Sequence, residues 1–207
     1  MELKDNIVHE AQKLFSVNGF LGTGINDIIA ASGTSKGGFY NHFASKEDLF
    51  YAVLTESQSL WRDRVLYSIK EIDSPTEKII QILNNYRERY LMDSDNFPGG
   101  CIFITFSTEL DDTRPHLMKE VNKGFEGFKG LLTRFIDDGI AQGELIQGLN
   151  SDAVADTLFA GMLGASVLYG VDKDSSTLDH SIDSLIEYVF FLSSKQTLDN
   201  VMHSNSV

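Results

Sequence analysis

The sequence predicts an all-α fold of nine helices, in which a small three-helix head precedes a larger helical body. Apolar residues recur at three- and four-residue spacing along most of the chain, which is the pattern of amphipathic helices. Only three prolines occur, and all of them fall at expected helix starts or in loops. No segment alternates apolar and polar residues between hairpin turns, so strands are not expected.

Four helices with short connections are expected at the N-terminal end. They cover residues 4–18, residues 25–32, residues 36–42 and a stretch that starts at residue 45. Gly19 stops the first helix and Gly33 the second, because glycine readily adopts the backbone conformation that ends a helix. Ser35 caps the third helix, and Ser45 with Asp48 forms a capping box for the fourth.

Five further helices are expected in the remainder of the chain. They cover residues 75–92, 101–110, 115–143, 151–169 and 178–194. Ser74 and Pro75 give an N-cap followed by proline at the first helical position, and Asn150 is a second N-cap. Gly170 is expected to stop the eighth helix, and residues 196–207 to form a frayed polar tail.

The composition is that of a chain able to form a substantial core, with 42% hydrophobic residues among 207. The N-terminus lacks a basic region followed by an apolar one, and no apolar run reaches the roughly 20 residues that a membrane span needs. The single cysteine, Cys101, can form neither an intramolecular disulfide nor a zinc–thiolate site. We therefore expect a cytoplasmic protein with no membrane partner.

The formal net charge of −13 argues against nucleic-acid binding, because phosphate contacts need Lys and Arg. The charge is unevenly distributed, however. Residues 1–64 carry 6 basic and 8 acidic residues, a net −2, whereas the remainder carries 11 basic and 22 acidic, a net −11. This asymmetry fits a nearly neutral head that contacts nucleic acid and an acidic, solubilising body.

The second and third expected helices, joined by the tight Gly-Thr-Ser turn at residues 33–35, have the organisation of a helix-turn-helix. The second helix of such a unit must enter a DNA major groove about 12 Å wide, so its N-terminal outer face must be small and polar. Lys-Gly-Gly at residues 36–38 meets this requirement. Each glycine costs about 1 kcal/mol of helix propensity relative to alanine, which a purely structural helix has little reason to accept.

The motif GTSKGGFYNHFASKEDL at residues 33–49 resembles the signature of the TetR family of transcriptional regulators (TetR/AcrR type). The resemblance is motif-specific over about residues 7–50 and depends on helix count and order over the rest. It implies a homodimer, most commonly a repressor, that binds palindromic double-stranded operator DNA and is released by a small organic or electrophilic effector. Residues 1–48 would then bind DNA, residues 49–195 would bind effector and dimerise, and 196–207 would be the tail.

The resemblance also implies which residues contact DNA. They are Thr23, Thr34, Ser35, Lys36, Gly37, Tyr40, Asn41, His42 and Lys46. The chemistry agrees, because a tyrosine hydroxyl donates to phosphate and Lys46 adds charge at the positive end of a helix. Gly38 departs from the family pattern, in which a hydroxyl-bearing or larger residue is common. Taken alone, either Tyr40 or Lys46 would be interpreted as an ordinary solvated surface residue, and the DNA-binding assignment depends on the turn, glycines, cap and aromatic residues that accompany them.

In the family, the last two helices form an intersubunit four-helix bundle, which here implies a set of dimerisation residues. They are Leu158, Gly161, Met162, Ala165, Leu168, Leu185, Val189 and Phe190. A helix that is apolar most of the way round must be covered on several sides, which supports this assignment. The alternative is that these residues are buried inside one subunit.

An effector pocket is implied among the middle helices, where apolar walls with a few polar groups would suit a small organic ligand. The candidate residues are Trp61, Tyr86, Tyr90, Cys101, Phe103, Thr105, Phe106, Asn122 and Phe125. The alternative interpretation is ordinary core, since aromatic residues at helical spacing more often serve as packing. Cys101 lies at an expected helix N-terminus, a position that favours the reactive thiolate. It is therefore either a redox or electrophile sensor or a small buried apolar residue.

No catalytic or metal-binding set is expected. Asp111, Asp112 and His116 lie close in sequence but lack a zinc-binding histidine pair, and the Glu-x-x-His motif of di-iron bundles is absent from the sequence. We therefore expect no enzyme and no cofactor. A second alternative, a helical interaction protein that has lost DNA binding, is disfavoured by the intact Lys36, Gly37 and Tyr40.

Overall fold

The structure is a computed structural model that describes residues 2–110 and 112–193. These residues form nine α-helices and no strand, which confirms the predicted all-α fold. The helices are α1 Leu3–Gly22, α2 Ile25–Ser32, α3 Lys36–Tyr40, α4 Lys46–Val65, α5 Pro75–Asn85, α6 Ile102–Leu110, α7 Pro115–Ala141, α8 Ser151–Asp172 and α9 Ser175–Phe191. The predicted tail lies outside the described residues, and the last helix ends at Phe191, before the predicted end at residue 194.

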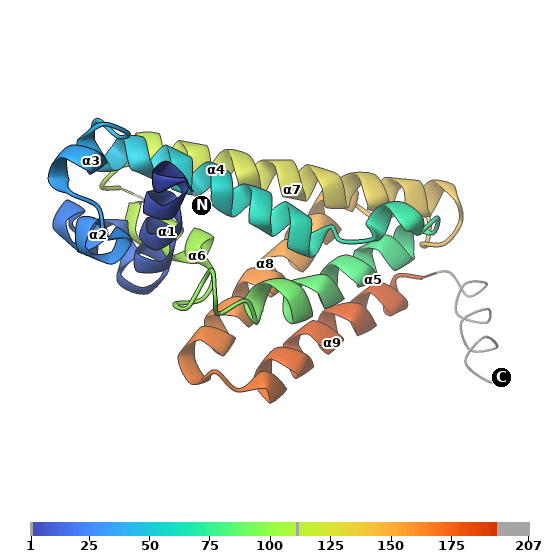
Figure 1. The fold of residues 1–207 in the computed structure, drawn as a ribbon. Coiled ribbons are helices and arrows are strands. Elements are labelled where there is room, and N and C mark those ends of the chain that lie inside the picture. Colours follow the sequence, from blue (N-terminus) through green and yellow to red (C-terminus); the bar gives the residue numbers. More distant parts are fainter. Residues whose placement is uncertain (1, 111, 194–207) are drawn as a thin grey trace. The chain divides into compact units, whose positions relative to one another are not determined.

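The chain divides into two compact units, which are described separately below. The head unit comprises Met1–Asp63 and Leu91–Gly124, and the body unit comprises Arg64–Tyr90 and Phe125–Val207. This division differs from a single boundary after residue 48, because most of α4 and all of α6 join the N-terminal helices. In the head unit, α1 packs against both α2 and α6 (Figure 1).

The core of the head unit is a cluster of aromatic rings from α1, α4 and α6. Phe15 lies 5.5 Å from Phe20 and 6.2 Å from Phe106 between ring centroids. Phe50 lies 5.3 Å from Phe20 and 4.8 Å from Phe106. All four side chains are at most 2% exposed, so helices far apart in sequence share one apolar centre.

The helix ends of the head follow the sequence signals closely. Gly19 has φ 73° and interrupts α1, and Gly33 with φ 65° ends α2. Asp48 N–H donates to Ser45 Oγ at 3.0 Å, while the Asp48 carboxylate accepts from Ala44 N–H at 2.9 Å. The predicted capping box is therefore present, except that the Asp48 carboxylate accepts from Ala44 N–H and not from the N–H of the N-cap residue Ser45.

In the body unit, α9 packs against both α8 and α5 (Figure 1). The predicted cap of α8 is confirmed, because Asn150 Oδ1 accepts from Ala153 N–H at 3.1 Å. The predicted stop at Gly170 is wrong: α8 continues to Asp172 and ends at Lys173, which adopts φ 54°. Asp174 then caps α9, accepting from Ser176 N–H at 2.8 Å, which holds the pKa of its carboxyl below the ordinary value.

The expected single helix over residues 75–92 is interrupted. Regular α5 ends at Asn85 and continues as the π-helical turn η2, Tyr86–Leu91. Such turns are rare and frequently occur at functional sites. At the other end of α5, Ser74 caps Glu77 N–H at 3.1 Å as predicted. A second carboxylate, that of Glu144, accepts from the Ser74 hydroxyl at 2.8 Å and from Thr76 N–H at 2.9 Å.

The α8 segment Ser151–Val171 is long and apolar enough to cross a membrane by length and composition alone. The expectation that no run in the sequence reaches this length is therefore wrong. Only 33% of the apolar window is buried inside the chain. An apolar helix with so little internal cover presents a face that another surface can bury.

Candidate nucleic-acid interface and associated surfaces

Helix α3 presents the residues predicted to contact DNA on an outward face. Ser35 Oγ accepts from Gly38 N–H at 3.0 Å, the N-cap bond that the sequence predicts. Phe39 lies on the inner face and is 0% exposed. The predicted contact residues around it that are exposed are Ser35, Lys36, Gly37, Tyr40, Asn41 and His42. Thr34 is half-buried, and α3 ends at Tyr40 rather than at residue 42.

Tyr40 joins the buried and exposed sides of this motif. Its ring meets Phe39 edge-on at a centroid distance of 5.2 Å, and Phe39 in turn lies 5.9 Å from Phe43. Tyr40 is nevertheless 46% exposed. Apolar packing thus fixes the ring while much of the residue remains in solvent, as a phosphate donor requires.

The two glycines of α3 differ in what surrounds them. A Cβ on Gly37 would meet only Ser35 Oγ, at 3.9 Å, so this position leaves room for close approach by a ligand. A Cβ on Gly38 would overlap Thr34 Oγ1. The departure from the family pattern at Gly38 therefore makes room for the Thr34 hydroxyl.

Thr23 and Lys46 are placed differently from the other predicted DNA contacts. Thr23 is 1% exposed, and its hydroxyl donates to the Gly19 carbonyl at 2.7 Å. Lys46 Nζ donates to the carbonyls of Phe20 at 2.7 Å and Thr23 at 2.8 Å. Both side chains hold the connection from α1 to α2, and direct phosphate contact by either of them remains a prediction.

The electrostatic surroundings of Lys46 agree with this placement. Burial lowers the pKa of its ammonium group, the charge of Glu109 opposes the shift, and that of Arg114 adds to it. The ammonium also lies 4.4 Å from the centroid of the Phe20 ring. The loss of water around Lys46 is thus compensated by backbone carbonyls and an aromatic face.

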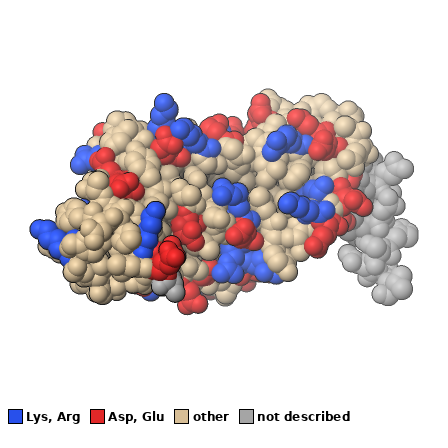
Figure 2. Space-filling view, turned by 45° about the horizontal axis from the view of Figure 1, so that its top comes forward, with Lys and Arg blue, Asp and Glu red and all other residues tan. Residues whose placement is uncertain are grey.

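Charge on the molecular surface is mixed in sign. On the face in Figure 2, Lys and Arg side chains are interspersed with Asp and Glu rather than gathered into one basic patch. This face therefore does not present a broad positive field.

Most of the predicted dimerisation residues contact their own subunit. Leu158, Met162, Ala165 and Val189 are at most 2% exposed within the single chain. Leu185 is half-buried, and a Cβ on Gly161 would lie 2.5 Å from its Cδ2, so Gly161 permits close approach of α9 to α8 within the subunit. Of the other two, Phe190 is half-buried and Leu168 is 51% exposed.

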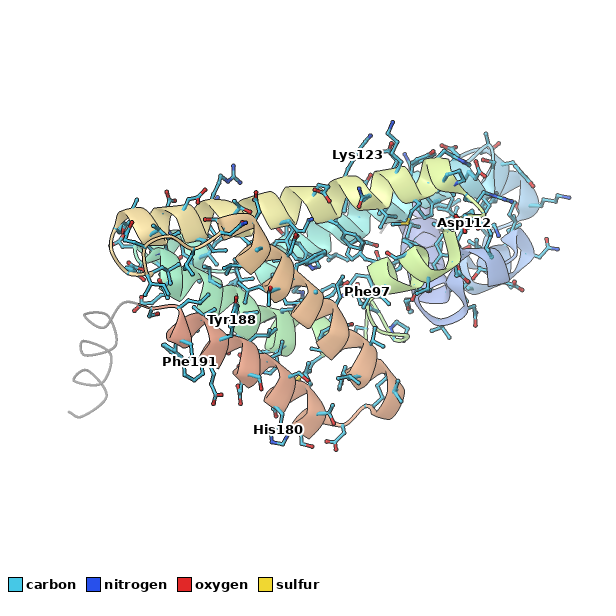
Figure 3. All side chains as sticks on the ribbon, turned by 180° about the vertical axis from the view of Figure 1, so that it is seen from behind. Phe97, Asp112, Lys123, His180, Tyr188 and Phe191 are labelled. Atoms are coloured by element: carbon cyan, nitrogen blue, oxygen red, sulfur yellow. The ribbon has the colours of Figure 1, made fainter. Side chains whose placement is uncertain are left out.

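The apolar residues of α8 and α9 that remain exposed form a partly different set. Val167 is 49%, Val171 82% and Phe191 81% exposed. Figure 3 labels Phe191 at the C-terminal end of α9, with Tyr188 one turn before it. Val167, Leu168 and Val171 lie toward the C-terminal end of α8, whereas Phe191 lies at the other end of the helix pair, where the Leu192 carbonyl accepts from Ile146 N–H at 2.9 Å. We call these four exposed residues of the two helices the apolar α8–α9 face: Val167, Leu168, Val171 and Phe191.

Six of the predicted effector residues belong to the head unit. Phe106 is 0% exposed and lies in the aromatic core described above. Cys101 and Phe103 are each 8% exposed, Trp61 and Thr105 are half-buried, and Asn122 is exposed. The Cys101 carbonyl accepts from Ile104 N–H at 3.1 Å in the first turn of α6, immediately after the loop that contains Phe97 (Figure 3).

The other three predicted effector residues belong to the body unit. Tyr86 and Tyr90 lie on the π-helical turn, with stacked rings 5.6 Å apart, and are 2% and 1% exposed. Phe125 is half-buried and contacts Phe159 edge-on at 5.2 Å. The stacked tyrosines are part of the buried interior of this unit, and their role in effector binding remains a prediction.

Comparisons with known proteins identify the family. Residues 7–53 match the family described as bacterial regulatory proteins, tetR family, and residues 75–185 match the tetracyclin repressor-like C-terminal domain. The chain belongs to the TetR family of transcriptional regulators. It is thereby a transcriptional regulator and not an enzyme, and regulators of the TetR family bind DNA and small-molecule ligands and act as dimers.

Several relatives in the TetR family match nearly the whole chain. The HTH-type transcriptional repressor DhaR of Mycobacterium sp. (strain GP1) is 27% identical over 185 residues, which cover 89% of this chain and 91% of DhaR. The HTH-type transcriptional regulator YxaF of Bacillus subtilis (strain 168) is 32% identical over 178 residues, covering 84% and 88%. A crystal structure of a TetR transcriptional regulator from Chloroflexus aurantiacus J-10-FL matches with a TM-score of 0.85 and 31% identity, covering 92% and 96%.

One residue that holds the head of this TetR-family protein together, Glu109, could not be anticipated from the sequence. Glu109 of α6 accepts hydrogen bonds from Phe20 N–H at 2.7 Å and Leu21 N–H at 3.4 Å. No local motif marks Glu109, because its partners lie 88 and 89 positions earlier in the chain. Only the glycine at position 19, which leaves backbone groups without helical partners, hints that a distant acceptor is needed.

Proposed function

We propose that this protein is a homodimeric repressor that binds palindromic operator DNA in the cytoplasm and is released by a small organic effector. The observation that carries the proposal is the outward face of α3. Its first turn is capped by Ser35, its inner side is fixed by the buried Phe39, and Lys36, Gly37 and Tyr40 remain exposed. This is the arrangement that places the start of a recognition helix against base edges and a tyrosine against a phosphate.

A homodimer follows from the size of the reading head. One helix-turn-helix contacts one half-site, and two heads related by a two-fold axis contact half-sites about 34 Å apart, or a multiple of that distance. The apolar α8–α9 face supports such an assembly, because it leaves Val171 and Phe191 more than four-fifths exposed in the single chain. Two copies meeting at this face would remove both side chains from water.

The proposal is tested by selecting DNA with the purified full-length chain from a pool of randomised duplexes. We expect enrichment of an inverted repeat whose affinity falls steeply with salt, because phosphate contacts release counterions. No enrichment, or tight binding that does not respond to salt, would overturn the proposal. The enriched sequence, hereafter the selected duplex, serves as the probe in the experiments below.

Tyr40→Phe isolates the proposed phosphate contact, because it removes the hydroxyl and keeps the ring on Phe39. We expect the affinity for the selected duplex to fall about tenfold or more, since a hydrogen bond to a charged group contributes about 1.5–3 kcal/mol. The loss should be similar for variant sequences of the duplex, because phosphate contacts carry no sequence information. A gel-shift titration over several salt concentrations measures both effects.

Tyr51→Phe is the matched control for this variant. Tyr51 lies on α4 of the same unit, is 41% exposed, and meets Phe50 edge-on at 5.9 Å, much as Tyr40 meets Phe39. Its affinity for the selected duplex should equal that of the wild type. Equal affinities of the wild type, Tyr40→Phe and Tyr51→Phe would show that the Tyr40 hydroxyl does not contact DNA.

The effector is proposed to be a small molecule held by the apolar and aromatic residues of the middle helices. Two proteins with the same fold support a ligand-binding role: a regulator from Saccharomonospora viridis was solved with choline, and AibR with isovaleryl coenzyme A and operator DNA. These two proteins are 20% and 19% identical to this chain, so their ligands do not identify the effector here. A thermal-shift screen of apolar and electrophilic compounds, followed by release of the selected duplex, tests this part.

Cys101→Ser distinguishes the two interpretations of the single cysteine. Because Cys101 is 8% exposed, we expect its side chain to act as a small buried group. Release of the selected duplex by quinones, aldehydes or hypochlorite should then be the same in the variant and the wild type. Loss of that response in the variant would establish Cys101 as the sensor, because the sequence contains no other thiol.

A further inference from the structure

The kink in α1 leaves backbone donors that a side chain from α6 satisfies. Gly19 adopts φ 73° and ψ 168°, a conformation that only glycine adopts readily and that breaks the regular hydrogen bonding of the helix. The Glu109 carboxylate lies in the space that a Cβ on Gly19 would occupy. From there Glu109 Oε2 accepts from Phe20 N–H at 2.7 Å and from Leu21 N–H at 3.4 Å.

The carbonyl groups of the same segment are held from a second helix. Lys46, in the first turn of α4, donates to the carbonyls of Phe20 at 2.7 Å and Thr23 at 2.8 Å. Thr23 itself donates to the Gly19 carbonyl at 2.7 Å. The connection from Gly19 to Thr23 is thus fixed on its donor side by a carboxylate and on its acceptor side by an ammonium group.

This connection leads directly into the DNA-reading part of the head. Gly24 is the N-cap of α2, and its N–H donates to the Asp27 carboxylate at 2.8 Å. Glu109 and Phe106 are three residues apart, so both project from one side of α6 toward α1. Phe106 packs on Phe15 of α1 while Glu109 bonds to the backbone of the connection. One helix therefore sets both the position of α1 and the path of the chain into α2.

We propose that Glu109 is a positioning residue for DNA binding: its carboxylate fixes the α1–α2 connection and thereby the orientation of α2 and α3. The inference rests on the proposed function, because it concerns how the head is held for operator binding. The negative charge matters, since bonds from backbone N–H to a carboxylate are shorter and stronger than bonds to a neutral oxygen. A glutamine at this position would keep an acceptor and lose that strength.

The test compares Glu109→Ala and Glu109→Gln with Glu120→Ala in the full-length dimer. Glu120 lies on α7 of the same unit and pairs with Lys123 at 2.7 Å, so its replacement removes a carboxylate without touching the connection. Hydrogen–deuterium exchange at the amides of Phe20 and Leu21 measures, without any DNA, whether the Glu109 carboxylate protects these two N–H groups. Affinity for the selected duplex reports its consequence for binding.

In Glu109→Ala we expect exchange at both amides to accelerate about tenfold or more, with a similar loss of affinity. Glu109→Gln should lie between alanine and the wild type, and Glu120→Ala should match the wild type in both measurements. Glu109→Gln preserves side-chain volume and decides the question if the alanine variant does not fold.

Two results would overturn the proposal: unchanged exchange at Phe20 and Leu21 in both Glu109 variants, or accelerated exchange with unchanged affinity for the selected duplex. Failure of the proposed function is distinguishable from both. In that case the wild-type protein selects no duplex, and there is no binding geometry for Glu109 to set. The proposal then fails with it, although exchange still shows whether the carboxylate holds the backbone.

Discussion

Val171→Asp and Phe191→Asp are each expected to convert the protein from a dimer to a monomer at micromolar concentration. Both residues lie on the apolar α8–α9 face and are 82% and 81% exposed in the single chain. In a two-fold symmetric interface each substitution occurs twice. Burying an unpaired carboxylate costs several kcal/mol, so dimer dissociation constants should rise about a hundredfold or more.

Sedimentation equilibrium of the wild type and the two variants measures this effect directly. Affinity for the selected duplex should fall in parallel, because a monomer contacts only one half-site at a time. Met92→Asp is the matched control, since Met92 is a 54% exposed apolar residue of the head unit. Variants that remain dimeric with unchanged affinity would show that the subunits meet at a different surface.

The apolar α8–α9 face illustrates what the sequence pattern of a helix can and cannot predict. The family resemblance, supported by the broadly apolar C-terminal helices, implies that Leu158, Met162 and Val189 contact a partner subunit. In the structure these side chains are buried against their own subunit. When a helix is apolar on most sides, its sequence does not distinguish the side that faces its own chain from the side left exposed. The exposure of Val171 and Phe191 became visible only once α8 and α9 were placed together.

Helix N-caps could be predicted more accurately than the dimer residues, because their hydrogen bonds join residues that are close in sequence. The N-caps at Ser35, Ser74 and Asn150 are each confirmed by a hydrogen bond to a backbone N–H three residues later. Such bonds involve neighbours in sequence, so the residue type and spacing suffice to predict them. Gly170 was misread because a glycine within an apolar helix resembles a stop signal, whereas the chain ends α8 at Lys173.

In the candidate DNA-binding site, too, features set by neighbouring residues could be predicted and features set by distant residues could not. The small polar start of α3 could be recognised in the sequence, and Lys36 and Gly37 are exposed there while Phe39 is buried. The placement of Thr23 and Lys46 did not follow, because their partners are the carbonyls exposed by the kink at Gly19. Glu109 was missed altogether, since bonds between residues 89 positions apart leave no trace in a single sequence.

Gly99→Ala is expected to destabilise the head unit, because the backbone at Gly99 touches the backbone of α1. A Cβ there would overlap the Ser16 carbonyl and lie 2.7 Å from Val17 N, and neither group belongs to a side chain that can move aside. Gly99 N–H also donates to Ser16 Oγ at 3.2 Å. The added carbon must separate the loop from α1, with an expected loss of about 1–3 kcal/mol or more in the free energy of unfolding.

Gly127→Ala provides a control with the opposite expected sign. Gly127 lies within α7, is exposed, and a Cβ there would meet nothing within 4 Å. Alanine should therefore stabilise the protein by about 0.5–1 kcal/mol through its greater helix propensity. Thermal unfolding at matched protein concentration measures both changes. In a chain of this size each kcal/mol shifts the midpoint of unfolding by roughly 2–4 °C. Two variants with equal midpoints would mean that the loop before α6 does not rest on the α1 backbone.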